Sequence, residues 1–200
     1  QIERFAHVCF QEARKMNGRL TNVHKANVLA TSRLWDAVFK EVSQKYTDVT
    51  MESILVDNVA FQLVKNPVQF NGVMALENMQ GDILTDQAGG ILGSLGLMPS
   101  ACYNPETGKG YYEPSHGSAP DIAGQNRANP YAMIGSVAFM FEKSFGLQEE
   151  SKLIWNSLTN VFAQGYRTRE LSSKNTPESM IVSTSQFGDL VVENILKDVA

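Results

Sequence analysis

Two aspartates four positions apart are the first feature of this sequence that suits catalytic chemistry. Asp82 and Asp86 follow an apolar run at residues 73–76, which is expected to end a buried strand at Gly81. If a helix begins at Asp82, both carboxylates project from one helical face, where a Mg²⁺ or Mn²⁺ ion would offset their repulsion. In the plainer alternative, Asp82 caps the helix and Asp86 is a solvated acid of its first turn.

Two further polar residues stand just after predicted strands. Lys25 follows a strand expected at residues 20–23, and Asp57 ends one expected at residues 51–56. Taken singly, Lys25 reads as a surface lysine and Asp57 as a helix cap. In open α/β sheets, however, ligands bind outside the carboxyl ends of the strands. The agreement of Lys25, Asp57 and Asp82 therefore predicts a shared site.

Helices between these strands would bring the three positions together. Apolar residues at helical spacing predict helices over residues 2–16 and 34–46, the second capped by Thr31 or Ser32. This alternation is typical of βαβ units and a largely parallel sheet. The rest of the chain is expected to form two short strands and then helices, with a connecting segment at residues 165–183. The strands are predicted at residues 99–103 and 110–113, and the helices at 131–145, 153–162 and 187–195.

The stretch at residues 113–124 is a second candidate for ligand binding, because its Gly, Ser, Ala and Pro residues let a ligand approach the backbone closely. His116 can stack or form hydrogen bonds, and Asp121 can accept hydrogen bonds from vicinal hydroxyls, as the acid does in dinucleotide sites. The sequence has no GxGxxG motif, which excludes an ordinary Rossmann fingerprint. The alternative is a structured surface loop.

Composition narrows the class of protein. A formal net charge of −4 over 200 residues argues against a nucleic-acid binder, and the longest apolar stretch, residues 132–141, is too short to cross a membrane. Cys9 and Cys102 form no CxxC pair and are expected to be buried thiols in a reducing cytoplasm. The chain opens inside a helical pattern without a methionine, which indicates a piece of a longer protein.

Several ordered motifs together resemble the β-decarboxylating dehydrogenases, a family that includes isocitrate, isopropylmalate, homoisocitrate and tartrate dehydrogenases. The resemblance covers essentially the whole chain and is to the C-terminal portion of that family, closest to its 3-isopropylmalate branch. It implies an α/β fold of the isopropylmalate dehydrogenase type, a mixed sheet with flanking helices whose N-terminal half is missing. The motifs are His-Lys-Ala-Asn-Val at residues 24–28, Val-Asp-Asn at 56–58, Glu-Asn-Met-Gln-Gly-Asp-Ile-Leu-Thr-Asp at 77–86, Gly-Ser-Leu-Gly at 93–96, and residues 113–124 with Ala-Asn-Pro at 128–130.

The resemblance implies roles for the acidic and basic candidates. Asp82 and Asp86 match metal-binding aspartates of one subunit, and Asp57 matches an aspartate from the partner subunit that completes the Mg²⁺ or Mn²⁺ site. Lys25 matches a lysine, also from the partner, that transfers protons. Together these matches imply a homodimer with shared active sites.

The resemblance also implies an NAD site. Asn27 matches a residue near the nicotinamide and the substrate, and Asp121 is the acid expected of enzymes that prefer NAD to NADP. The remaining matched positions lie in the loop for the adenosine half of the cofactor. They are Glu113, His116, Gly117, Ser118, Ala119, Ile122 and Asn129.

The implied reaction is the oxidative decarboxylation of a 2-hydroxy acid, 3-isopropylmalate, to 4-methyl-2-oxopentanoate and CO₂ in leucine biosynthesis. His24, Gln80 and Gln87 depart from the pattern of many 3-isopropylmalate dehydrogenases. Isocitrate, homoisocitrate and tartrate therefore stay open as substrates, as does a non-catalytic nucleotide-binding module. Residues 1–92 are expected in the substrate and dimerisation domain and residues 93–200 in the cofactor domain, and the fragment alone is expected to be inactive.

Overall fold

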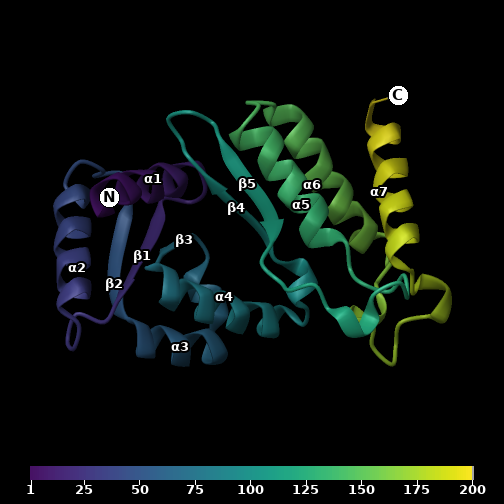
Figure 1. Cartoon of the computed structure of the whole chain (residues 1–200), viewed down its shortest axis with the longest axis horizontal. Coiled ribbons are helices and arrows are strands. Elements are labelled where there is room, and N and C mark those ends of the chain that lie inside the picture. Colours follow the sequence, from purple (N-terminus) through teal and green to yellow (C-terminus); the bar gives the residue numbers. More distant parts are fainter. Residues whose placement is uncertain (200) are drawn as a thin grey trace. The chain divides into compact units, whose positions relative to one another are not determined.

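The computed structural model describes residues 1–199 and divides the chain into two compact units (Figure 1). The first unit is Gln1–Ile91, and the second begins at Leu92. This division lies one residue from the boundary expected from the sequence, while the roles of the two units stay predictions.

A three-stranded parallel sheet organises the first unit, in the order β2-β1-β3. The chain reaches the neighbouring strands through helices, as the alternating pattern predicted. The elements are α1 (Ile2–Lys15), β1 (Arg19–His24), α2 (Ala30–Ser43), β2 (Thr50–Leu55), α3 (Val56–Lys65), the 3₁₀ turn η1 (Pro67–Phe70), β3 (Val73–Ala75) and α4 (Asn78–Leu92).

Side chains of β1 point to both faces of the sheet and pack into a separate apolar cluster on each face. Leu20 packs with Phe10 of α1 and Phe39 of α2, and the two rings lie 6.4 Å apart. Val23 faces the other way and packs with residues of α3 and α4. Because successive side chains of a strand point to opposite faces, β1 is covered on both sides and its end is held in place.

Helix α4 begins earlier than expected. The prediction placed a break at Gly81 and a helix start at Asp82, but α4 starts at Asn78 and continues through Gly81. The Glu77 side chain accepts hydrogen bonds from the backbone N–H groups of Met79 and Gln80, at 3.3 and 3.1 Å, and so satisfies the free donors of the first turn. Asp82 is therefore not a helix cap.

The cap predicted for α2, and the alternative interpretation of Asp57 as the cap of α3, were wrong as well. Leu29 and Leu55 occupy the cap positions, and neither makes a side-chain cap hydrogen bond. Ser32 is buried inside the first turn of α2, and Asp57 lies within the first turn of α3. Both helices follow directly from the turn or strand before them, which leaves no place for a separate capping side chain.

The second unit contains a β-hairpin and three long helices. Strands β4 and β5 pair antiparallel, so the parallel and antiparallel pairs of this fold lie in separate sheets. Helix α5 packs on the hairpin and on α6, and α6 packs on α7 around Leu158 and Phe187. The elements are η2 (Leu95–Leu97), β4 (Pro99–Tyr103), β5 (Gly110–Pro114), η3 (Pro120–Ile122), α5 (Tyr131–Lys143), α6 (Gln148–Ala163), η4 (Arg169–Leu171), η5 (Glu178–Met180) and α7 (Thr184–Val199).

One expectation about burial was wrong. Cys9 is buried as predicted, and burial raises the pKa of its thiol to about 12, but Cys102 is exposed on β4. Helix α5 is apolar nearly all round, yet Met133 is half exposed because the hairpin and α6 cover only part of the helix. Among residues 1–199, no helix is long and apolar enough to span a membrane.

Candidate active site and nucleotide pocket

The carboxyl ends of β1 and β2 bring Lys25 and Asp57 together. The parallel register pairs His24 with Leu55, so the residues that follow leave the sheet side by side. Lys25 Nζ donates to Asp57 Oδ1 at 2.5 Å, and this hydrogen bond holds the pKa of the Asp57 carboxyl below its usual value. The lysine side chain is largely covered, whereas that of Asp57 is exposed. The structure therefore places Lys25 and Asp57 side by side at one edge of the sheet, while their shared function stays a prediction.

A largely buried polar network begins at His24, the residue before Lys25. His24 is 8% exposed, and its Nδ1 accepts a hydrogen bond from the Ala26 N–H at 3.2 Å. Its Nε2 atom lies 3.6 Å from Asp36 Oδ1. Because Nδ1 acts as an acceptor, the ring proton belongs on Nε2, facing Asp36. His24 thus joins the turn after Lys25 to helix α2.

Asp36 and Asn22 connect this network to both neighbouring elements. The Asn22 amide donates to Asp36 and to Ser53 of β2, each at 3.0 Å, and Trp35 Nε1 donates to Asn22 Oδ1 at 2.7 Å. Burial alone would raise the pKa of Asp36, but hydrogen bonds from Lys40 and Ser53 and the nearby His24 lower it. Sequence reasoning missed Asn22 on the central strand and Asp36 on α2, because a polar residue gives no local sign of a partner that is distant in the sequence.

The two aspartates of the opening motif lie one turn apart on α4. Asp82 and Asp86 are both exposed, so they are accessible to a cation. Within residues 1–199, no three His, Cys, Asp or Glu side chains are grouped as a metal site would require. Asp57 therefore does not join Asp82 and Asp86 within one chain.

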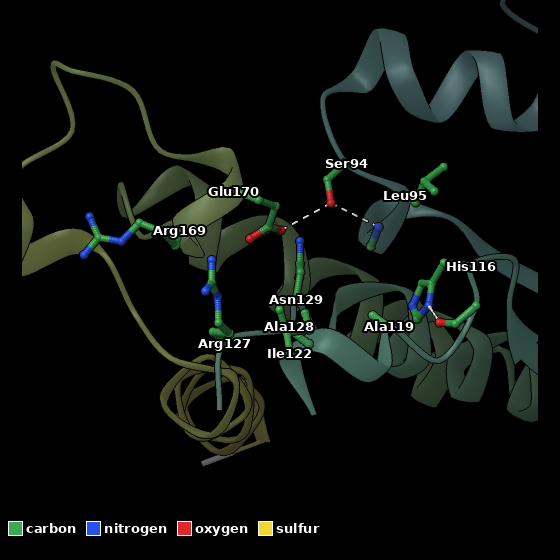
Figure 2. A pocket seen from close by; sticks show the side chains of 12 residues that line it. Ser94, Leu95, His116, Ala119, Ile122, Arg127, Ala128, Asn129, Arg169 and Glu170 are labelled. Atoms are coloured by element: carbon green, nitrogen blue, oxygen red, sulfur yellow. Dashed lines mark hydrogen bonds between the residues drawn. The ribbon is translucent and has the colours of Figure 1, made fainter. Parts of the chain in front are cut away.

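The second unit contains a pocket of about 520 Å³ (Figure 2). Its volume lies in the range of small-molecule sites. Five of the predicted cofactor residues line it, and they come from the loop around η3 and the start of α5. The lining residues are Ser94, Leu95, Gly96, His116, Gly117, Ala119, Ile122, Arg127, Ala128, Asn129, Arg169 and Glu170.

Asn129 gives this pocket an unsatisfied donor. Its Oδ1 accepts a hydrogen bond from the Tyr131 N–H at 3.0 Å and so caps α5, although Pro130 occupies the cap position itself. The residue is 7% exposed, and its Nδ2 has no hydrogen-bond partner among the described residues. A buried amide donor without a partner costs free energy, so a ligand acceptor in the pocket would relieve that cost. A Cβ atom at Gly96 would lie 2.9 Å from Asn129 Cβ, which explains the glycine there.

His116 also lines the pocket. Its Nδ1 is 2.8 Å from the Gly117 carbonyl oxygen. A carbonyl only accepts, so Nδ1 carries a hydrogen in this contact and Nε2 is left to face a ligand.

The other predicted cofactor residues lie outside the pocket lining. Glu113 accepts a hydrogen bond from the Tyr111 hydroxyl at 2.6 Å, and Ser118 and Asp121 are exposed. Asn27 lies in the turn after β1, in the first unit, and its proposed contact with the nicotinamide stays a prediction. The lining residues missed from the sequence include Arg169 and Glu170, which belong to a segment interpreted only as a connection.

Comparison with known proteins identifies the family of this chain. The family described as isocitrate/isopropylmalate dehydrogenase matches residues 1–191. The chain belongs to the isocitrate/isopropylmalate dehydrogenase family. Similar 3-isopropylmalate dehydrogenases include those of Neisseria gonorrhoeae, 46% identical over 192 residues, and Thermotoga maritima, 47% identical over 194 residues. These matches cover 96% and 97% of this chain, but 52% and 53% of the relatives. The chain thus spans about half the length of the relatives it matches.

Solved structures of the family show the same fold. Isocitrate dehydrogenase from Methylococcus capsulatus superposes with a TM-score of 0.85 at 34% identity, over 97% of this chain and 56% of that one. A β-decarboxylating dehydrogenase from Thermococcus kodakarensis, in an apo form, gives 0.82 at 32% identity, over 98% of this chain and 55% of that one. The α/β fold and the family inferred from the motifs are therefore confirmed.

Proposed function

We propose that this chain is the C-terminal part of an NAD- and metal-dependent dehydrogenase that oxidatively decarboxylates 3-isopropylmalate to 4-methyl-2-oxopentanoate and CO₂ in leucine biosynthesis. The observation that carries the proposal is the Lys25–Asp57 pair at the end of the parallel sheet of a chain in this family. Similarity to 3-isopropylmalate dehydrogenases at 46–48% identity supports that substrate over isocitrate, homoisocitrate or tartrate.

Lys25 and Asp57 would handle protons in this reaction. An ammonium group can donate a proton to the carbon that loses CO₂, and the neutral amine can accept one from the 2-hydroxyl. Asp57, whose pKa is lowered by the Lys25 hydrogen bond, stays ionised and holds the amine in place. His24 would fix the turn that carries Lys25 through its bond to Ala26.

The acids of α4 fit a divalent cation. Asp82 and Asp86 offer exposed carboxylate oxygens one helical turn apart, the ligand type that Mg²⁺ and Mn²⁺ prefer. A bound ion would act as a Lewis acid toward the hydroxyl and carboxylate of the substrate. We assign Asp82 and Asp86 of one subunit and Asp57 of the other to this site.

The pocket of the second unit fits the adenosine half of NAD, the hydride acceptor in the proposed reaction. Asn129 Nδ2 supplies an unpaired donor for a ring nitrogen of adenine, and His116 supplies a ring that can stack. Small residues at Gly117 and Ala119 leave room for a planar base. We assign Ile122 to the same contact, and we keep Glu113, Ser118 and Asp121 at the rim of the site as a proposal.

A homodimer is the proposed assembly, because the acids of one site are divided between two copies. Helices α3 and α4 expose large apolar side chains to solvent in the single chain. Phe61 and Val64 of α3 are 59% and 71% exposed, and Met79 and Ile83 of α4 are 61% and 63% exposed. Patches of this kind mark protein–protein contacts. The two free thiols suit a reducing cytoplasm, which is the proposed location.

Turnover of the full-length protein tests the proposed function. NADH formation would be followed in the presence of Mn²⁺ and NAD with 3-isopropylmalate, isocitrate, homoisocitrate or tartrate. We expect the highest kcat/KM with 3-isopropylmalate. A higher kcat/KM with another acid would make that acid the assigned substrate in place of 3-isopropylmalate. No turnover with any of them would favour a non-catalytic nucleotide-binding module.

A further inference from the structure

We propose that Asp36 of α2 is a positioning residue of the candidate active site, because it holds the His24 ring in the orientation and tautomer that fix the turn carrying Lys25. This inference rests on the proposed function and adds a residue to it. In the described part of the chain, no hydrogen bond or ion pair joins Asp36 to Lys25 or Asp57. Any effect of Asp36 on the pair therefore passes through His24.

The turn after β1 depends on an acceptor that His24 supplies. The Ala26 N–H donates to His24 Nδ1 at 3.2 Å. The N–H groups of Val28 and Leu29 donate to the Lys25 carbonyl oxygen, at 3.1 and 2.9 Å. A backbone N–H only donates, so Nδ1 must carry a lone pair. If the ring turned over, or if its proton moved to Nδ1, the Ala26 N–H would face a carbon or a second hydrogen.

Asp36 supplies the charge that keeps the ring proton on Nε2. His24 Nε2 lies 3.6 Å from Asp36 Oδ1, and the two side chains are only 10% and 14% exposed. A carboxylate that faces Nε2 favours the tautomer with a hydrogen on that nitrogen. Because both groups are largely shielded from water, this preference is stronger than it would be on the surface.

Three donors hold the Asp36 carboxylate in its ionised form. Its Oδ1 accepts hydrogen bonds from Asn22 Nδ2 and Ser53 Oγ, each at 3.0 Å. Its Oδ2 accepts a hydrogen bond from Lys40 Nζ at 2.7 Å. Burial raises the pKa of this carboxyl, but the hydrogen bonds from Lys40 and Ser53 outweigh burial, so the pKa lies below its usual value. The donors belong to β1, β2 and α2, which ties the carboxylate to all three elements.

The orientation of the Asn22 amide is fixed as well. Trp35 Nε1 donates to Asn22 Oδ1 at 2.7 Å, and an indole N–H only donates. The Asn22 nitrogen must therefore face Asp36 and Ser53, as it does, and the residue is fully buried. Each donor and acceptor in this network has one assignment, so the hydrogen on His24 Nε2 follows from the positions of the heavy atoms.

Steady-state kinetics of the full-length enzyme with 3-isopropylmalate, NAD and Mn²⁺ test the proposal. Asp36→Asn should lower kcat by up to about 10²-fold with little change in KM, because a misplaced reacting group costs rate of that order. Glu41→Gln, which removes an exposed acid of the same helix, should leave kcat unchanged. Because Asp36→Asn also lowers stability, every variant is assayed where circular dichroism shows the native fold.

Two substitutions of His24 separate positioning from stability. In His24→Asn, Oδ1 takes the place of Nδ1 and can accept the Ala26 N–H without help from Asp36. In His24→Gln, the side-chain amide reaches Asp36 but leaves the Ala26 N–H without its acceptor. We expect a higher kcat in His24→Asn than in His24→Gln. In the His24→Asn background, Asp36→Asn should cause little further loss of kcat, since the two residues act as one unit.

Ring ¹⁵N NMR reports the tautomer directly, and the signals that disappear in His24→Asn identify His24. We expect a hydrogen on Nε2 in the unmodified protein and a weaker preference for that tautomer in Asp36→Asn. An unchanged kcat in Asp36→Asn, an equal loss of kcat with and without His24, or an unchanged tautomer would each overturn the positioning role. If the unmodified enzyme turns over none of the four proposed acids, the proposed function fails, and the role of Asp36 in it is refuted too.

Discussion

Lys25 Nζ lies 2.5 Å from Asp57 Oδ1, although 32 positions separate the two residues in the sequence. The contact follows from the parallel pairing of β1 and β2, in which His24 is opposite Leu55. Each strand ends at the same edge of the sheet, so the residue after one strand meets the first turn of the helix after the other. The pair places a lysine ammonium group against a carboxylate at the end of the parallel sheet.

Replacing Lys25 with Met in the full-length protein should lower kcat far more than it raises KM. General acid–base catalysis contributes about 10²–10⁴-fold to rate, so a loss of that order is expected. Steady-state kinetics with 3-isopropylmalate measure it. Lys109→Met, in the turn between β4 and β5, serves as the matched control. A kcat within about threefold of the unmodified enzyme would show that Lys25 is not a proton-transfer group.

Asp36→Asn should destabilise the first unit in a pH-dependent way. The pKa of Asp36 is lowered in the folded state, so its contribution is present above its unfolded pKa and is lost as the pH falls through the folded pKa. At neutral pH the variant should lose about 1–3 kcal/mol of unfolding free energy, the order for a buried hydrogen-bonded charge. Below about pH 4 the difference from the original chain should shrink.

Urea unfolding followed by Trp35 fluorescence measures this effect, because Trp35 donates to Asn22 within the same network. A Trp155→Phe background removes the signal of the second unit. Asp198→Asn, at an exposed position near the end of α7, is the control. A difference that stays constant from neutral to acidic pH would contradict the role of the ionised Asp36 carboxylate.

The double variant Asp82→Asn, Asp86→Asn should weaken Mn²⁺ binding to the full-length protein by more than about tenfold, because amide oxygens carry no charge for a hard cation. Titration calorimetry measures the affinity. Asp189→Asn, which removes an exposed acid of α7, is expected to bind the ion normally. Unchanged affinity in the double variant would falsify the assignment of these two aspartates.

Val64→Asp should convert the proposed dimer to a monomer at micromolar concentration. Val64 is 71% exposed on α3, and a charge there would be costly in an apolar interface. Light scattering measures the mass, and circular dichroism shows whether the variant keeps its fold. Met16→Asp, which changes an exposed apolar residue after α1 at the other end of β1, should leave the dimer intact. A full-length protein that is already monomeric and active would refute the shared site.

Much of the fold follows from local patterns in the sequence. The period of apolar residues predicted the parallel strands and most helices, because a strand or helix must bury one repeating face. Local patterns failed at helix starts. Glu77, rather than Asp82, satisfies the first N–H groups of α4, and Leu55, rather than Asp57, stands at the cap of α3. Several polar residues near each boundary are capable of capping, so only the path of the backbone selects among them.

The sequence by itself determined the family, because long ordered motifs can be recognised without a structure. It also identified Lys25, Asp57, Asp82 and Asp86 as candidate site residues, because they follow predicted strands or belong to those motifs. The tertiary structure alone decided which side chains meet. It joined Lys25 to Asp57, placed Asp36 beside His24, and brought Glu170 and Ser94 together in the lining of the second unit's pocket. These contacts link residues 12 to 76 positions apart. Their formation depends on how whole elements pack, which no local pattern specifies.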